Sequence, residues 1–158
     1  MMIKRLFGMA ACLLLAACIA QEGSSQELAV SQVIFTSPEG KTAHIQVEIA
    51  QDEKSRNKGL MFRENLDFGK GMAFMWEEPG IYKMWMKNTY IPLDIIFIHD
   101  KHIVGMVQGA KPHDLTPVGP DVKSNWAIEV PAGYIEKVGL TPSWTVSLQN
   151  EQLSKRPN

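Results

Sequence analysis

The sequence has little cysteine and no long apolar run. Only two cysteines occur in 158 residues, which excludes a small domain held together by disulfide bonds. Nine prolines and twelve glycines exclude a collagen-like chain, and a hydrophobic content of 45% excludes a wholly disordered one. The only strongly apolar block, residues 6–18, is too short to span a bilayer as a mature helix. What is present fits one globular domain, with no room for a second of normal size.

The N-terminus has the features of an export signal. Lys4 and Arg5 precede the apolar residues 6–15, and two alanines then precede Cys18. This order of charge, apolar core and small residues is typical of a secretory signal. A cysteine directly after two alanines resembles the lipobox of bacterial lipoproteins, which implies cleavage before Cys18 and acylation of its sulfur and amine. An ordinary signal peptide with an incidental cysteine is the alternative.

The lipoprotein resemblance predicts how the whole chain is organised. Residues 1–17 form the signal peptide, and residues 18–30 form a lipidated cysteine and a polar, flexible tether. Residues 31–149 form the folded domain, and residues 150–158 form a disordered tail. Ile19, rather than aspartate, follows the cysteine. By resemblance to Gram-negative lipoproteins, this implies the periplasmic face of the outer membrane.

The charge balance argues against a nucleic-acid partner. Loss of Lys4 and Arg5 with the signal leaves 14 basic and 17 acidic residues, a net charge of −3. Nucleic-acid affinity depends mainly on neutralising phosphates, which a mildly acidic chain does poorly. The partners that we expect are therefore the membrane, through lipid on Cys18, and a small-molecule ligand.

The domain sequence predicts a mainly β, β-rich α+β fold. Short apolar or alternating segments with turn residues between them indicate strands over residues 31–36, 42–50, 71–76, 81–87, 92–99, 103–107, 126–130 and 144–148. Asp52 predicts a capped helix over residues 53–58, and a second short helix is expected over residues 132–138. Residues 111–125 are expected to form a long loop. This pattern favours a small barrel or a rolled, antiparallel-type sheet with one or two short helices.

Three stretches carry a resemblance to a known family. They are residues 56–63 (RNKGLMFR), 84–98 (MWMKNTYIPLDIIFI) and 128–133 (IEVPAG). In this order and spacing they resemble the DUF192 family, also called UPF0127, over nearly all of residues 31–149. Residues 71–76 (GMAFMW) fit the family's Gly-Met-Leu-Phe pattern with alanine in place of leucine. The resemblance implies a small β-rich fold, often exported, and no established activity.

Alternation along residues 81–87 singles out a tryptophan. In an extended segment, Lys83, Trp85 and Lys87 share one side, opposite an apolar side that includes Met84 and Met86. One explanation is packing across strands, with lysine stems covering the ring. The other is an aromatic floor with a cationic rim, which suits a saccharide or a small anion.

Polar residues follow this segment. Asn88 and Thr89 come next, and Asp94 lies in a strand that is apolar on both faces. Asp94 is therefore expected to be at least partly buried and paired, with Lys87, Asn88 and Thr89 as the nearest candidates. It is either a structural latch that holds this turn or one wall of a binding cleft.

Glu129 stands between Ile128 and Val130. It is either an ordinary polar residue of an alternating strand or the partner of Asp94 in a carboxylate pair. Such a pair could hydrolyse glycosides. Met84 and Met86 offer another alternative, Cu(I) binding by thioethers, although core packing explains both methionines better.

The histidines show no metal-ligand spacing, and phosphate-loop and nucleophile-elbow motifs are missing. We therefore expect neither a metal nor a cofactor, and a role without catalysis. The favoured hypothesis is a membrane-tethered module that binds a small saccharide or anion. Its candidate site residues are Trp85, Lys87, Asn88, Thr89, Asp94 and Glu129. The alternatives are a hydrolase that uses Asp94 and Glu129, a Cu(I)-binding protein and a purely structural envelope protein.

Overall fold

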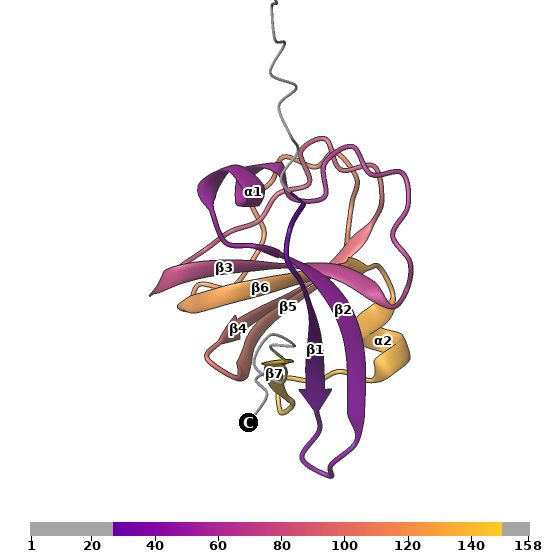
Figure 1. Ribbon diagram of the computed structural model, residues 1–158, viewed down its shortest axis with the longest axis vertical. Helices are drawn as coiled ribbons and strands as arrows, with labels where there is room; N and C mark the ends of the chain where they lie inside the picture. Colours follow the sequence, from indigo (N-terminus) through magenta and orange to yellow (C-terminus); the bar gives the residue numbers. More distant parts are fainter. Residues whose placement is uncertain (1–26, 150–158) are drawn as a thin grey trace, which may run out of the picture.

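The computed structural model describes residues 27–149 (Figure 1). The described chain contains seven strands and two short helices, in the order β1 (Val30–Thr36), β2 (Thr42–Ala50), α1 (Glu53–Lys58), β3 (Lys70–Gly80), β4 (Leu93–His99), β5 (His102–Ala110), β6 (Ser124–Pro131), α2 (Tyr134–Val138) and β7 (Thr145–Gln149). The mainly β fold that the sequence predicts is thus confirmed. The predicted signal peptide, Cys18, most of the tether and the tail lie outside the described residues.

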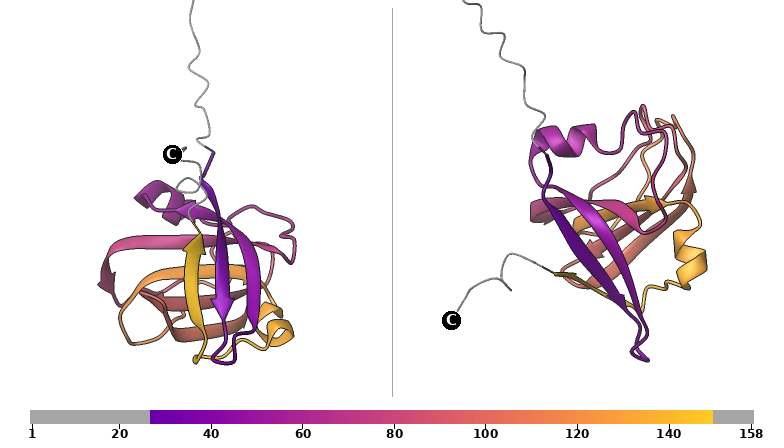
Figure 2. Two further views of the ribbon diagram at one scale, coloured as in Figure 1. Left: turned by 60° about the horizontal axis from the view of Figure 1, so that its bottom comes forward. Right: turned by 45° about the vertical axis from the view of Figure 1, so that its right-hand side comes forward.

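The strands form a closed but irregular ring in the order β1-β2-β3-β6-β4-β5-β7 (Figures 1 and 2). Neighbours are antiparallel except β2 and β3, which pair in parallel from Gln46–Lys70 to Ala50–Phe74. A parallel pair needs a crossover connection, and the segment that contains α1 supplies it here. Between β5 and β7 the ring closes through a single residue pair, His102 and Thr145.

Two apolar clusters lie on the two faces of the ring. The barrel interior is filled from β1, β2, β4 and β6, by residues such as Phe35, Ile45, Ile96 and Ile128. A second cluster, here called the outer layer, packs on the outside of β3, β4 and β6. Its buried residues are Ala50, Leu60, Met72, Phe74, Met84, Met86, Leu93, Ile95, Phe97, Ala110 and Ala127. The expected burial of β4 on both faces is therefore confirmed.

The outer layer is covered by α1 and by two irregular segments, residues 59–69 and 81–92, here called the covering segments. The Asp52 side chain accepts a hydrogen bond from Ser55 N, which caps α1 as the sequence predicts. Residues 81–87 are not a strand, contrary to expectation. They form one isolated bridge to Val118. In it Met84 N donates to Val118 O at 2.9 Å, and Val118 N donates to Met84 O at 2.8 Å. The segment lies over the sheet because β3 is already paired on both edges, by β2 and β6.

A close backbone approach at Gly71 predicts a mutational effect. A Cβ atom there would lie 2.5 Å from the carbonyl oxygen of Glu129 on β6, whereas one at Gly69 would meet nothing within 4 Å. Gly71→Ala should lower the free energy of unfolding by about 1–3 kcal/mol, because β6 must move. Gly69→Ala, the matched control, should change it by less than about 0.5 kcal/mol. Urea unfolding measures both, and equal effects would contradict the close packing of β3 against β6.

Candidate functional site

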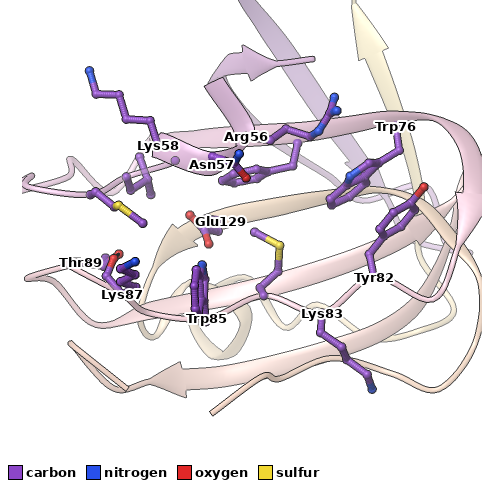
Figure 3. A pocket seen from close by; sticks show the side chains of 15 residues that line it. Arg56, Asn57, Lys58, Trp76, Tyr82, Lys83, Trp85, Lys87, Thr89 and Glu129 are labelled. Carbon is purple, nitrogen blue, oxygen red and sulfur yellow. Dashed lines mark hydrogen bonds between the residues drawn. The ribbon is translucent and has the colours of Figure 1, made fainter. Parts of the chain in front are cut away.

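A cavity of about 220 Å³ lies on the outer face of the ring, between β3 and β6 on one side and the covering segments on the other (Figure 3). Its walls combine aromatic, cationic and thioether side chains around one carboxyl group. The lining residues are Arg56, Asn57, Lys58, Gly59, Leu60, Met61, Phe74, Trp76, Tyr82, Lys83, Met84, Trp85, Lys87, Thr89 and Glu129. The end of α1 and residues 82–89 thus bring distant parts of the chain to one place.

Glu129 supplies the only carboxyl group among the residues that line this cavity. Alternation along β6 places Trp126, Ile128 and Val130 in the barrel interior, so Glu129 points outward beneath the covering segments. It is 4% exposed, and its neighbours across the strands are Met72 on β3 and Ile95 on β4. Within residues 27–149 no hydrogen bond reaches its carboxyl group, whose oxygen atoms border the cavity; the fully buried side-chain atom without a partner in this part of the chain is Ser124 Oγ. Burial raises the pKa of Glu129 to about 8, so the group is mostly a neutral acid at pH 7.

Aromatic rings form two parts of the wall. Trp76 on β3 stacks on Tyr82 with ring centroids 4.0 Å apart and planes 9° from parallel. Trp85 is 48% exposed, and its indole nitrogen edge points toward Glu129 in Figure 3. The Lys87 ammonium lies 5.1 Å from the centre of the Trp85 ring, as expected for lysine packing on this tryptophan. Half-exposed indole beside a buried acid provides a surface for a flat or sugar-like molecule.

Four cationic side chains line the cavity, and two of them are held by the protein. Arg56 donates to the carbonyl oxygens of Gln51 and Met75. Lys83 donates to the carbonyl oxygens of Gly119 and Pro120 and pairs with Asp121 at 2.7 Å. Its ammonium points away from Glu129, as does that of Lys58 (Figure 3).

The other two cations, Lys58 and Lys87, have no carboxylate within 4.0 Å in the described part of the chain, whose ion pairs involve Arg63, Lys70, Lys83 and His99. Desolvation raises the pKa of Glu129, and none of these cations lowers it. The positive charges therefore form a rim rather than a partner for the buried acid.

Four of the six site residues predicted from the sequence line this cavity: Trp85, Lys87, Thr89 and Glu129. Asn88 does not. It has a left-handed backbone (φ 52°), its carbonyl oxygen accepts a hydrogen bond from Phe62 N at 2.8 Å, and its amide nitrogen lies 4.0 Å from the sulfur of Met61. Asn88 thus connects the two covering segments that carry lining residues.

Asp94 also lies elsewhere, 1% exposed in the barrel wall. One carboxylate oxygen accepts a hydrogen bond from Gly109 N at 2.8 Å, and the other accepts one from Ile135 N at 3.0 Å. The expected partners Lys87, Asn88 and Thr89 were therefore wrong. Backbone amides of β5 and α2 take their place, so Asp94 is a structural latch, but one that joins β5 to α2 rather than one that holds the turn after residue 87.

The two buried carboxyl groups do not meet. In the β4–β6 register Asp94 lies opposite Val130, which faces the interior, and Glu129 lies opposite Ile95, which faces the outer layer. Side chains at paired positions share a face, so the two acids project to opposite faces of the wall. The carboxylate pair considered for glycoside hydrolysis is not formed. Met84 lines the cavity but Met86 does not, so the suggested thioether pair does not converge there either.

The cavity is also lined by residues that were not predicted as site residues from the sequence: Arg56, Lys58, Trp76 and Tyr82. The first two lie in one of the stretches that carry the family resemblance, but only a tertiary contact with residues 82–89 gives them a shared cavity. The stacked pair could have been suspected from two aromatic residues flanking the turn signal Pro79-Gly80.

The architecture and the site define a small, mainly β protein whose strands close into an irregular ring, with a cavity of about 220 Å³ on its outer face. The chain belongs to the DUF192 family, described as an uncharacterized ACR, which it matches over residues 34–148. No curated protein matches the chain. No helix among the described residues is both long and apolar enough to cross a bilayer.

Two crystal structures are similar. A protein of Sinorhizobium meliloti 1021, suggested to be a transcription regulator, is 32% identical, with a TM-score of 0.75, over 77% of this chain and 95% of that one. A protein of unknown function from Novosphingobium aromaticivorans DSM 12444 is 31% identical, with a TM-score of 0.73, over 89% of this chain and 99% of that one. Both relatives share the fold of this chain.

The buried acid predicts how stability depends on pH. The pKa of Glu129 rises from 4.5 to about 8 on folding, so the folded state binds more protons than the unfolded chain between these values. The free energy of unfolding should therefore fall as pH rises from 5 to 9. Glu129→Gln should remove this contribution, which amounts to up to about 4 kcal/mol.

Guanidinium unfolding at both pH values measures the effect. Glu136→Gln, at an exposed position of α2, is the control and should keep the wild-type dependence. A Glu129→Gln protein with an unchanged pH profile would show that Glu129 is ionised in the folded state.

Proposed function

We propose that this protein is a binding module for a small saccharide or anion, held in the cavity lined by Trp85, Lys87, Thr89 and Glu129. The observation that carries the proposal is the convergence of a half-exposed indole and a buried carboxyl group without a protein partner. Buried polar groups are normally hydrogen-bonded, and a ligand is one source of the missing partner. Asn88 contributes indirectly, through the segments that it connects, and Asp94 through the fold.

Binding is favoured over catalysis because the cavity lacks the groups that hydrolysis needs. Its lining contains one carboxyl group, whereas glycosidases use two on either side of the bond. Serine, cysteine and histidine do not line it, so the cavity lacks the histidine base that commonly activates a hydroxyl or thiol nucleophile. What the cavity offers is an aromatic face, a hydrogen-bonding acid and positive charge.

Truncation of the indole tests this proposal. Trp85→Ala should weaken binding of the best ligand from a panel of monosaccharides and small anions about tenfold, which corresponds to about 1.4 kcal/mol. Phe68→Ala is the control, since Phe68 is an exposed aromatic residue outside the cavity. Thermal shift finds the ligand and calorimetry measures its affinity. Equal affinities of Trp85→Ala and wild type, or a panel without any ligand, would contradict the proposal.

We also propose that lipid on Cys18 tethers the domain to the periplasmic face of the outer membrane. Support comes from the basic, apolar and small-residue order before Cys18. The first described residues support the geometry of a tether. Leu28 packs on the outer layer, and Ala29 O accepts a hydrogen bond from Ile49 N at 2.8 Å. A tether would thus join the domain beside α1, the element that contributes Arg56 and Lys58 to the cavity (Figure 1).

Mass spectrometry tests the anchor. The protein purified from membranes should begin at Cys18 and carry acyl chains on its sulfur and amine. Cys18→Ser should leave the domain folded and shift it from the membrane fraction to the soluble fraction, because one residue carries the lipid. An unmodified thiol at the mature terminus, or a membrane-bound serine variant, would refute the anchor.

The suggested role of the Sinorhizobium protein in transcription is not extended to this chain. The net charge of −1 for the whole chain, or −3 without residues 1–17, does not favour phosphate binding over a long stretch of DNA. The cationic residues described above border one cavity of about 220 Å³, which suits a small molecule.

A further inference from the structure

Glu129 has a feature that binding of a generic small molecule does not explain. Its carboxyl group is buried against apolar neighbours on β3 and β4 and receives no hydrogen bond from the described residues, yet it borders an open cavity. A buried carboxyl group without a partner is costly, and methionine or leucine would fill the same space without that cost. The other buried acid, Asp94, accepts two backbone hydrogen bonds, so the fold is able to satisfy such a group.

We propose that the ligand is an anion and that Glu129 binds it as a neutral carboxylic acid, donating its proton in a hydrogen bond to a ligand oxygen. The proposal rests on the function proposed above and specifies its ligand class: a small carboxylate or phosphate ester whose body lies against Trp85. An O–H···O⁻ hydrogen bond is among the stronger protein hydrogen bonds. Such a ligand would supply the hydrogen-bond partner that the described residues do not provide for Glu129.

The charges that face Glu129 decide between an anion and a cation. Arg56 and Lys58 come from α1, and Lys83 and Lys87 come from residues 82–89; all four line the cavity around Glu129, although the ammonium groups of Lys58 and Lys83 point away from its carboxyl group (Figure 3). The flanking strands contribute no charge beside it, since its neighbours there are Met72 and Ile95. A cavity with indoles and an acid could hold an ammonium ligand through cation–π contacts. Here every charged group on the rim is positive, which repels such a ligand and attracts an anion.

The size of the cavity limits the anion to a small one. A volume of about 220 Å³ is below the range of about 300–1,000 Å³ that is typical of drug-sized ligands. A single hexuronic acid or an aromatic carboxylate is of the right class. Lys87, whose ammonium lies over the Trp85 ring and forms no ion pair among the described residues, is the rim cation available to the ligand's charge.

The sign of the pH dependence separates the two ligand classes. With a pKa of about 8, Glu129 is protonated at pH 6 and about nine-tenths ionised at pH 9. An anion that needs the neutral acid should then bind about tenfold more weakly at pH 9, because only protein molecules with a protonated Glu129 can bind it. A cationic ligand should show the opposite dependence and bind more tightly once Glu129 is ionised.

Calorimetry with chosen probes tests the inference on the wild-type protein. The acidic probes are D-glucuronate and benzoate, which stay ionised at both pH values. Methyl glucoside is the neutral sugar, and choline is the cation. We expect glucuronate or benzoate to bind at pH 6, more tightly than methyl glucoside, and to lose about tenfold in affinity at pH 9. We expect no binding of choline.

A variant isolates Glu129 from other groups that titrate in this range. Glu129→Gln keeps a hydrogen-bond donor and cannot ionise, so it should bind the acidic probe at pH 6 and change less than about twofold by pH 9. Glu136→Gln is the matched control and should retain the tenfold loss. A wild-type affinity that does not change with pH would overturn the inference, as would an equal pH dependence in Glu129→Gln.

The remaining outcomes separate this inference from the proposed function. If methyl glucoside binds as tightly as glucuronate and Trp85→Ala abolishes both, the cavity binds saccharides and the anion inference fails. Choline that binds better at pH 9 than at pH 6 would likewise replace the anion with a cation. If neither acidic probe binds at pH 6, the inference fails, and the wider ligand panel described above decides the proposed function.

Discussion

The structure depends on the burial of β4 and β6 from both sides. One face of each strand belongs to the barrel interior, and the other lies beneath the outer layer formed with α1 and residues 81–92. A polar side chain in the middle of either strand is therefore shielded from bulk water whichever way it points. This constraint makes two acidic residues in these strands conspicuous, because each must find a partner or remain a neutral acid.

The two acids meet this constraint in opposite ways. Asp94 points inward and accepts hydrogen bonds from the backbone amides of Gly109 and Ile135, so it joins β5 to the start of α2. Glu129 points outward, receives no hydrogen bond from the described residues and borders a cavity. The first arrangement explains stability without any ligand. The second is unexplained by the fold and gives the cavity its proposed role.

Sequence reasoning performed best where burial pattern and local chemistry agree. The Asp52 cap of α1, the two-sided burial of β4 and the outward direction of Glu129 all follow from periodicity and short-range rules. It failed at residues 81–87, where alternation indicates an extended segment but cannot tell a sheet strand from a chain that crosses over a sheet. The alternation itself survives, with Met84 and Met86 buried and Trp85 exposed. For this reason Trp85, Lys87 and Thr89 still belong to the site.

The β-rich class, the family resemblance and the small set of polar residues that need an explanation can all be inferred from the amino-acid order. Which of these residues meet depends on long-range contacts. Periodicity gives the face of a strand, but it does not say which faces of separate strands lie on the same side of the wall. That depends on the register between β4 and β6, which separates Asp94 from Glu129, and on the placement of α1 and residues 82–89 around one cavity, which brings Arg56 and Lys58 to the site. Both are long-range contacts, and no local pattern encodes them.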